Sequence, residues 1–428
     1  MNTKEEIKRK HNMRLYPFYE MLAYDLLFFY AIRIMFLNEV KGLSASQIVL
    51  GLTIYAIVSL ITQIPITLFV FRYGKRNMMI VGNLLMVIAS GLLFIVDNMA
   101  IYIVFQLVIS IGQGIKRITE SNLLTLSIPR GKFQNEIFIR IDKKGYGGYF
   151  ALSAITAIIA GYLYRINPYI PIVCTLVVSV LSLIISFSFY EFETITKTKF
   201  EKEENKYIKD LKSTMKFIVN SKRLRALFLY SSTIWGGVVL IATYKMTLLQ
   251  DIGASATFIG YAYALFELAD GLGAKIALEF NELMKKRSLF CVLVLTSILC
   301  VFIGIISNST INGLQKLIIV MVSLCFLAII KGISQIISRK YLNSFTNNKI
   351  LPSIYSVEWM LNSFCRMIVT FLGSALLLKV NIMVAFIILG GITFVLACLI
   401  SIYAKDKLGL SPDEYTKQDI FERHKFIF

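Results

Sequence analysis

The sequence predicts an all-α integral membrane protein with twelve transmembrane helices in two pseudo-symmetric six-helix bundles. Three observations predict this fold class. Hydrophobic residues make up 57% of the 428 residues, and the mean hydropathy is +0.69. Charged residues make up only 17%, whereas a soluble domain carries roughly a quarter. The charges collect in short gaps between long apolar runs, as they do when helices cross a bilayer.

Twelve apolar runs are long enough to cross a bilayer, which takes about 20 residues per helix. The first run follows a basic N-terminal segment and has no signal-peptidase site, so we expect it to be retained as a helix. The predicted helices, with approximate ends, are 15–38, 45–71, 78–96, 100–125, 144–166, 168–190, 226–249, 255–279, 288–308, 314–337, 352–379 and 381–404.

The longest polar stretch lies between the sixth and seventh predicted helices, at about residues 191–225, and holds ten Lys and Arg residues. Apolar residues recur at helical spacing in its second half, which predicts a basic amphipathic helix at the membrane surface. The predicted domains are therefore an N-terminal bundle (1–190), this linker (191–225), a C-terminal bundle (226–404) and a tail (405–428).

The distribution of positive charge predicts the orientation. With the N-terminus inside, the inner segments hold 34 Lys and Arg residues and the outer loops hold four. Basic residues remain on the cytoplasmic side of membrane proteins. We therefore predict a multi-pass protein of the cell membrane with both termini and the 405–428 tail in the cytoplasm. The net charge of +19 is explained by this topology, and no nucleic-acid partner is expected.

The two halves of the chain share a short pattern, which indicates a duplicated architecture. Small residues recur at a constant offset of 209 positions in the second and eighth predicted helices: Ala45, Ser46 and Gly51 in one, and Ala254, Ser255 and Gly260 in the other. Both helices lead into short basic loops.

Residues 63–76 read QIPITLFVFRYGKR. This segment resembles the second helix and following loop of major facilitator superfamily transporters, which often read E-x-P-x-G-x-x-x-D-R-x-G-R-R. The sequence Gly112-Gln113-Gly114 also resembles the Q-G pattern of the fourth helix of that family. The matching positions of the loop motif are Pro65 and the predicted cytoplasmic gate loop residues Arg72, Gly74, Lys75 and Arg76.

The resemblance implies a twelve-helix secondary transporter that works by alternating access, with helices 1, 4, 7 and 10 lining a central cavity. Gln63, Thr67 and Phe71 depart from the motif. In the family, the acidic residue at the position of Phe71 helps to latch the cytoplasmic gate, by pairing and by lying near a helix N-terminus. We therefore expect the gate of this protein to be held differently, or less firmly.

Carboxylates inside the predicted helices are candidates for proton coupling, because ionisable groups in lipid usually face a cavity or a partner. Asp25 is the strongest candidate, since it lies near the middle of the first helix. The others are Glu20, Glu120, Glu267 and Asp270. Glu267 and Asp270 share a helix face at i, i+3, and two close carboxylates resist ionising together. A structural role, as partners of basic residues, remains the alternative for each.

Basic and acidic residues in the fourth, seventh, tenth and eleventh helices are candidates for the substrate cavity. They are Lys116, Arg117, Lys245, Lys331, Glu358 and Arg366. Lys116 and Glu120 lie one helical turn apart and can pair, so a structural ion network fits them equally well. Pairing of Asp25 with Lys116 or Arg117 competes with a coupling role for Asp25.

The predicted function is secondary active transport of a small solute across the cell membrane, with protons as the coupling ion. Family analogy favours efflux of a small amphipathic compound or drug. Two alternatives stay open: an uptake permease for a small anionic or zwitterionic solute, and a transporter-like sensor that does not transport. The expected partners are the solute, the bilayer and protons, and the expected oligomeric state is a monomer.

Several other classes are not expected. The sequence contains no nucleotide-binding P-loop, so it predicts no ATP-driven pump. The two histidines lie near the chain ends, and the six cysteines show no CxxC spacing. The sequence therefore predicts no metal site, no catalytic residues and no cofactor, and the chain is not expected to be an enzyme.

Overall fold

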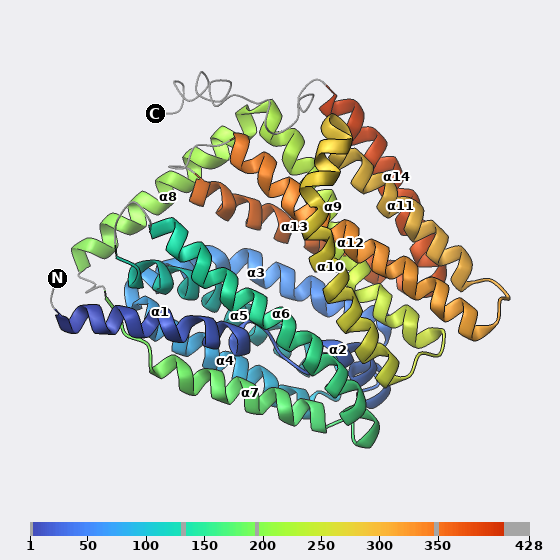
Figure 1. Ribbon diagram of the computed structural model, residues 1–428, viewed down its shortest axis with the longest axis horizontal. Helices are drawn as coiled ribbons and strands as arrows, with labels where there is room; N and C mark the ends of the chain where they lie inside the picture. The colour runs from blue at the N-terminus through green and yellow to red at the C-terminus, as the bar shows by residue number, and fades with distance from the viewer. Residues whose placement is uncertain (1–2, 130–133, 193–196, 346–350, 406–428) are drawn as a thin grey trace. The chain divides into compact units, whose positions relative to one another are not determined.

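The computed structural model describes residues 3–129, 134–192, 197–345 and 351–405, and every regular element in these ranges is helical (Figure 1). The predicted tail lies almost entirely outside them. The elements are α1 (Thr3–Ala23), α2 (Phe29–Met35), the π-helix η1 (Phe36–Val40), α3 (Ala45–Tyr73), α4 (Lys75–Ile95), α5 (Met99–Ser127), α6 (Gln134–Ile166), α7 (Ile170–Phe187), α8 (Lys197–Asn220), α9 (Lys222–Asp251), α10 (Ala256–Met284), the 3-10 helix η2 (Lys285–Arg287), α11 (Ser288–Ser307), α12 (Gly313–Phe345), α13 (Leu351–Leu377) and α14 (Ile382–Ala404).

The chain divides into two compact units. The first comprises Met1–Asn205 and Ser255–Ala264, and the second comprises Lys206–Ala254 and Leu265–Phe428. Helix α8 covers most of the predicted linker. The domain limits predicted at residues 190 and 226 stay predictions.

Ten helices in the described part of the chain are long and apolar enough to cross a membrane: α3–α7, α9 and α11–α14. The other two predicted helices differ in instructive ways. The prediction of one continuous helix over 15–38 was wrong, because the structure divides this stretch into α1, α2 and η1. Helix α10 is 29 residues long, but Glu267 and Asp270 lower its hydropathy.

The first unit is built on α5, which packs against α3 and α4, while α4 also packs against α7 and α1 packs against α6. A buried apolar cluster fixes α1 in this unit. It brings Tyr16, Tyr19 and Ala23 of α1 against Leu123 and Leu124 of α5. The N-terminal half of α1 is mostly polar, and this apolar face fixes its C-terminal half against α5.

The second unit is organised around α9 and α11, and its most extensive helix packing is that of α11 against α14. A Cβ atom added at Gly304 would lie 2.7 Å from the carbonyl oxygen of Met383, and one at Gly390 would lie 2.8 Å from that of Ser297. Only glycine allows this approach. Small residues bring helix backbones together in membranes, where packing replaces the hydrophobic effect.

The N-termini of α3 and α10 are capped alike by serine side chains. Ser44 Oγ accepts from the Gln47 N–H at 3.3 Å, and Ser255 Oγ accepts from the Phe258 N–H at 3.3 Å. These caps satisfy amide groups that a helix leaves open. The two caps are 211 residues apart, so the structural register differs by two positions from the sequence offset of 209.

Candidate functional site

The first transmembrane segment is interrupted at its middle. Helix α1 ends at Ala23 and α2 begins at Phe29, and Phe28 between them has φ 66°. Positive φ is unfavourable for a bulky residue, so the surrounding packing must hold this backbone. Asp25, the strongest coupling candidate, lies inside the interruption. The break therefore places a carboxylate among backbone groups that lie outside a helix.

The open backbone groups of the break are satisfied by two residues from other helices and by the side chain of Asp25 itself. The Lys116 ammonium on α5 donates to the carbonyl oxygen of Ala23. The Thr175 hydroxyl on α7 donates to the carbonyl oxygen of Leu27 at 2.8 Å. Asp25 Oδ1 accepts from the Leu26 N–H at 3.0 Å. Backbone outside a helix is tolerated within a membrane only when protein groups or water satisfy it.

A chain of side-chain hydrogen bonds runs from Asp25 through α5 to α3. Gln113 Nε2 donates to Asp25 Oδ1 at 2.7 Å, and the Tyr55 hydroxyl donates to Gln113 Oε1 at 2.6 Å. Ser110 Oγ in turn donates to the Tyr55 carbonyl oxygen at 2.9 Å. Gln113 therefore connects the carboxylate to two packed helices, and the charge state of Asp25 bears on all of them.

Glu120 belongs to a second, more deeply buried network. Its Oε1 accepts from the Tyr19 hydroxyl at 2.5 Å and lies 3.6 Å from Lys116 Nζ. The Tyr19 hydroxyl accepts from Asn83 Nδ2 at 2.7 Å. Lys116 is 3% exposed and Glu120 is 7% exposed. The predicted Lys116–Glu120 ion pair is thus present, and it is tied to the break through the carbonyl of Ala23.

Glu20 lies on α1 against α6, where its side chain packs on Gly145. It is 6% exposed, and its Oε2 atom makes no hydrogen bond to any described residue. An unpartnered buried carboxylate oxygen is costly. Glu20 is therefore a second place in the first unit where a proton could be held.

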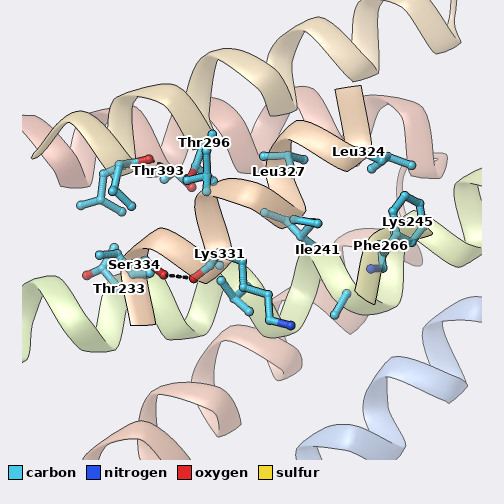
Figure 2. A pocket seen from close by; sticks show the side chains of 18 of the residues that line it. Thr233, Ile241, Lys245, Phe266, Thr296, Leu324, Leu327, Lys331, Ser334 and Thr393 are labelled. Carbon is cyan, nitrogen blue, oxygen red and sulfur yellow. Dashed lines mark hydrogen bonds between the residues drawn. The ribbon is translucent and has the colours of Figure 1, made fainter. Parts of the chain in front are cut away.

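The second unit contains a cavity of about 50 Å³ among α9, α10, α11, α12 and α14. Figure 2 shows Lys245 and Lys331 entering it from different helices. Lys245 Nζ lies 4.0 Å from the ring centroid of Phe266, in a cation–π contact. Most of the remaining wall is apolar and includes Ile241 and Leu327. Glu267 also lines the cavity.

Lys331 is neutralised by a carboxylate. Its Nζ donates to Asp270 Oδ2 at 2.7 Å, and the two side chains are 33% and 12% exposed. Three hydroxyl groups of the cavity wall donate to main-chain carbonyls of their own helices: Ser334 to Lys331 at 2.6 Å (Figure 2), Thr296 to Val292 at 2.8 Å and Thr393 to Leu389 at 2.8 Å. The polar groups of this cavity are thus largely engaged within the protein.

The remaining predicted cavity residues lie elsewhere. Arg117 is on the exposed side of α5. Glu358 and Arg366 are on α13, are partly buried and do not line the cavity of Figure 2. Glu358 Oε1 is 3.5 Å from the Ser231 hydroxyl on α9.

The predicted gate loop is a single-residue connection between α3 and α4. Gly74 has φ 91°, which side chains rarely adopt, and its N–H donates to the Val70 carbonyl oxygen at 3.1 Å. Arg72 is exposed and lies over the Tyr73 ring, and Lys75 is 7% exposed. The glycine makes the sharp turn that joins the two helices.

Arg76, in the first turn of α4, contacts the last residue of α7 and the segment after it. Its backbone N–H donates to Glu191 Oε2 at 2.8 Å, and its guanidinium donates to the Phe187 carbonyl oxygen at 2.8 Å. Glu191 therefore sits at the N-terminus of α4, where the helix dipole favours a negative charge.

The profile described as Major Facilitator Superfamily matches residues 20–249, more than half of the chain. The chain belongs to the Major Facilitator Superfamily. A curated relative in this superfamily, an uncharacterized MFS-type transporter, YxaM, of Bacillus subtilis (strain 168), is 22% identical over 313 residues, which are 73% of this chain and 76% of the relative.

Solved structures show the superfamily fold. A peptide transporter crystallised in complex with sulfate is 15% identical, with a TM-score of 0.68, and the match covers 95% of this chain and 96% of that one. A D-xylose–proton symporter is 11% identical, with a TM-score of 0.66, and the match covers 92% and 96%. The predicted fold class and family are thereby confirmed, and the protein is a multi-pass membrane transporter of the superfamily.

Sequence reasoning missed several residues of these networks. Gln113 was singled out only as part of a family pattern, and Tyr19 and Phe266 were not distinguished from other aromatic residues. Glu191 lies at the edge of the predicted linker. The sequence does not show which side chains from distant helices contact one another. It shows only that polar residues within apolar runs need partners.

The position of Glu191 provides a physical reading of the superfamily loop motif in this chain. The acidic position of the motif is occupied by Phe71, while the carboxylate of Glu191, from the segment after α7, accepts from a backbone N–H in the first turn of α4. The Arg76 backbone N–H is bonded to Glu191, and the expectation that the gate is held differently stays a prediction.

We expect Glu191→Ala to destabilise the protein by about 1 kcal/mol, because α4 would lose its N-terminal carboxylate. Glu191→Gln should cost less, since the amide oxygen can still accept from Arg76. The free energy of unfolding, measured by denaturant titration in detergent, checks both. Glu279→Ala, which removes an exposed carboxylate of α10, is the control. Equal effects of Glu191→Ala and Glu279→Ala would contradict this role.

Proposed function

We propose that this superfamily member is a proton-coupled secondary transporter that moves a small solute across the cell membrane by alternating access. The observation that carries the proposal is Asp25, a carboxylate in the interrupted first helix, bonded to the Leu26 N–H and to Gln113. Transporter sites are commonly built on interrupted helices near the middle of the bilayer. One solved structure of similar fold is that of a proton symporter by name, which is consistent with proton coupling.

Protonation of Asp25 would change the contacts that hold the break. The ionised carboxylate accepts from Gln113, which in turn accepts from Tyr55. A proton on Asp25 weakens the acceptor and supplies a donor, so Gln113 and Tyr55 must reorganise. Because these residues lie on α5 and α3, the bound proton can bias the packing of the first unit. That is the differential interaction that coupling needs.

Glu20 and Glu120 are the other proton-coupling candidates of the first unit. Glu120 is held by Tyr19 and Lys116, so its negative charge is stabilised and it is the weaker candidate. Glu20 has an unpartnered oxygen and is the stronger one. In the second unit, Asp270 is paired with Lys331 and Glu267 lines the cavity.

We propose efflux of a small amphipathic compound as the direction, by analogy with the superfamily. Uptake of a small anionic or zwitterionic solute is the second candidate, and the lysines of the cavity favour it. A sensor that does not transport is the third. We also propose a monomer with both termini in the cytoplasm, on the strength of the basic inner loops.

The test is reconstitution into proteoliposomes that hold a trapped pH-sensitive dye. A panel of small neutral, anionic, zwitterionic and cationic solutes is added on one side, and the solute-driven pH change is recorded. We expect proton movement with some of the solutes, and accumulation of the same solutes when a pH gradient is imposed. The sign of the proton movement distinguishes symport from antiport. Solute flux without any proton movement would contradict proton coupling, and no flux at all would favour the sensor.

A further inference from the structure

We infer that the cavity of the second unit binds the carboxylate of a small solute with an apolar body, and that Lys245 is its anchor. This inference rests on the proposed transport function, whose substrate class it names. Within the described residues, Lys245 is the cavity cation whose ammonium has no hydrogen bond or ion pair, and its contact is with the face of Phe266 at 4.0 Å.

The ion pair between Lys331 and Asp270 leaves Lys245 as the cation that a ligand carboxylate can meet, while Glu267 lines the same cavity. Lys331 is bonded to Asp270 at 2.7 Å, so its charge is already balanced. The ammonium of Lys245 is instead held by the ring of Phe266, and a cation–π contact is weaker than an ion pair with a carboxylate in a dry site. A ligand carboxylate can therefore replace the ring as the partner of Lys245 without breaking an existing ion pair.

The walls determine the rest of the ligand. Ile241, Leu327 and Leu293 face the cavity, and the hydroxyl groups of Thr296, Ser334 and Thr393 already donate to main-chain oxygens. Such walls offer apolar contacts and few open donors. A strongly hydrated inorganic anion, which needs several donors, would be poorly satisfied here, whereas a carboxylate on an alkyl or aryl body would be satisfied at both ends.

Glu267 makes a further distinction possible. It lines the same cavity on α10, so a ligand that carries an amino group as well as a carboxylate would meet a negative side chain. A simple carboxylate and an amino acid both carry the carboxylate that Lys245 would bind. The experiment therefore includes one ligand of each kind.

The experiment measures ligand-induced thermal stabilisation of the full chain, purified in detergent, without any ion gradient. The probes are butyrate, butyramide, butylamine, 4-aminobutyrate and sulfate at equal ionic strength. We expect butyrate to stabilise the wild-type protein, and butyramide and butylamine not to do so. In Lys245→Met the affinity for butyrate should fall at least about tenfold, which is the loss expected for one charge-assisted hydrogen bond. Lys275→Met, an exposed lysine of α10, is the control and should behave as the wild type.

A second variant keeps the test decisive if Lys245→Met fails to fold. Phe266→Leu removes the competing ring and retains the cavity, so butyrate should bind it more tightly than it binds the wild type. If 4-aminobutyrate binds more strongly than butyrate, Lys245 remains the residue that binds the carboxylate, and the ligand class is zwitterionic.

The inference is overturned if butyrate stabilises no better than butyramide, if sulfate is as effective as butyrate, or if Lys245→Met and Lys275→Met bind butyrate equally. Because no transport is measured, a protein that binds butyrate but moves no protons in vesicles would refute the proposed coupling and leave the binding site intact.

Discussion

Replacing Asp25 with asparagine is expected to abolish solute accumulation driven by a pH gradient. The amide oxygen can still accept from the Leu26 N–H and from Gln113, so the break keeps its main contacts and the protein should fold. The side chain can no longer gain or lose a proton, so coupling is lost. In proteoliposomes, gradient-driven accumulation should fall at least about tenfold, the difference that 1.4 kcal/mol makes in an equilibrium.

The control for this experiment is Asp97→Asn, which alters an exposed aspartate before α5 and should leave accumulation unchanged. Exchange of labelled for unlabelled solute, which needs no gradient, should continue in Asp25→Asn and shows that the binding site survives. Full gradient-driven accumulation in Asp25→Asn would exclude this residue as the proton carrier. If Glu20→Gln loses accumulation and Asp25→Asn does not, the proton carrier is Glu20.

Replacing Lys116 with methionine is expected to cause the largest loss of stability. Lys116 donates to the Ala23 carbonyl oxygen at the break and lies 3.6 Å from Glu120. The variant leaves a buried carboxylate and an open helix end without their cation, which costs on the order of 3–5 kcal/mol. The free energy of unfolding in detergent measures this loss, and Lys275→Met serves as the matched control.

A double variant separates the two contacts of Lys116. Glu120→Gln removes the charge that Lys116 balances, so Lys116→Met/Glu120→Gln should recover part of the stability that Lys116→Met loses. The part that is not recovered reports the contact with Ala23. An unchanged free energy of unfolding in Lys116→Met would show that the break is held without this lysine.

The helix limits were largely predictable from the sequence, because apolar runs end where basic loops begin. The prediction for the ninth helix, 288–308, differs by one residue from α11, Ser288–Ser307. Helix α4 begins three residues before its predicted start, at Lys75. A cationic residue in the first turn is polar but still helical, and hydropathy alone cannot assign it.

The interruption of the first helix was not predictable. Residues 24–28 read YDLLF and contain neither glycine nor proline, the residues that usually mark a break. Pro17 and Pro65, by contrast, lie inside continuous helices. The break is stabilised by partners from distant helices, Lys116 and Thr175, and tertiary contacts of this kind have no local signal.

The candidate site was predictable in its members and not in its pairings. Lys245, Glu267 and Lys331 stand out because ionisable residues in apolar runs need a reason to be there, and all three line one cavity. Which lysine is neutralised depends on how α10 and α12 are rotated toward each other. That rotation brings Asp270, and not a residue of its own helix, to Lys331.

The interrupted first segment also bears on how the chain is assembled in the membrane. The carbonyls of Ala23 and Leu27 obtain their partners from residues 93 and 148 positions later in the chain. Each unsatisfied backbone group in hydrocarbon costs several kcal/mol, so this segment is not stable in the bilayer on its own. It can settle only after α5 and α7 have been synthesised and inserted. This segment therefore reaches its final place in the unit later than the helices that supply its partners.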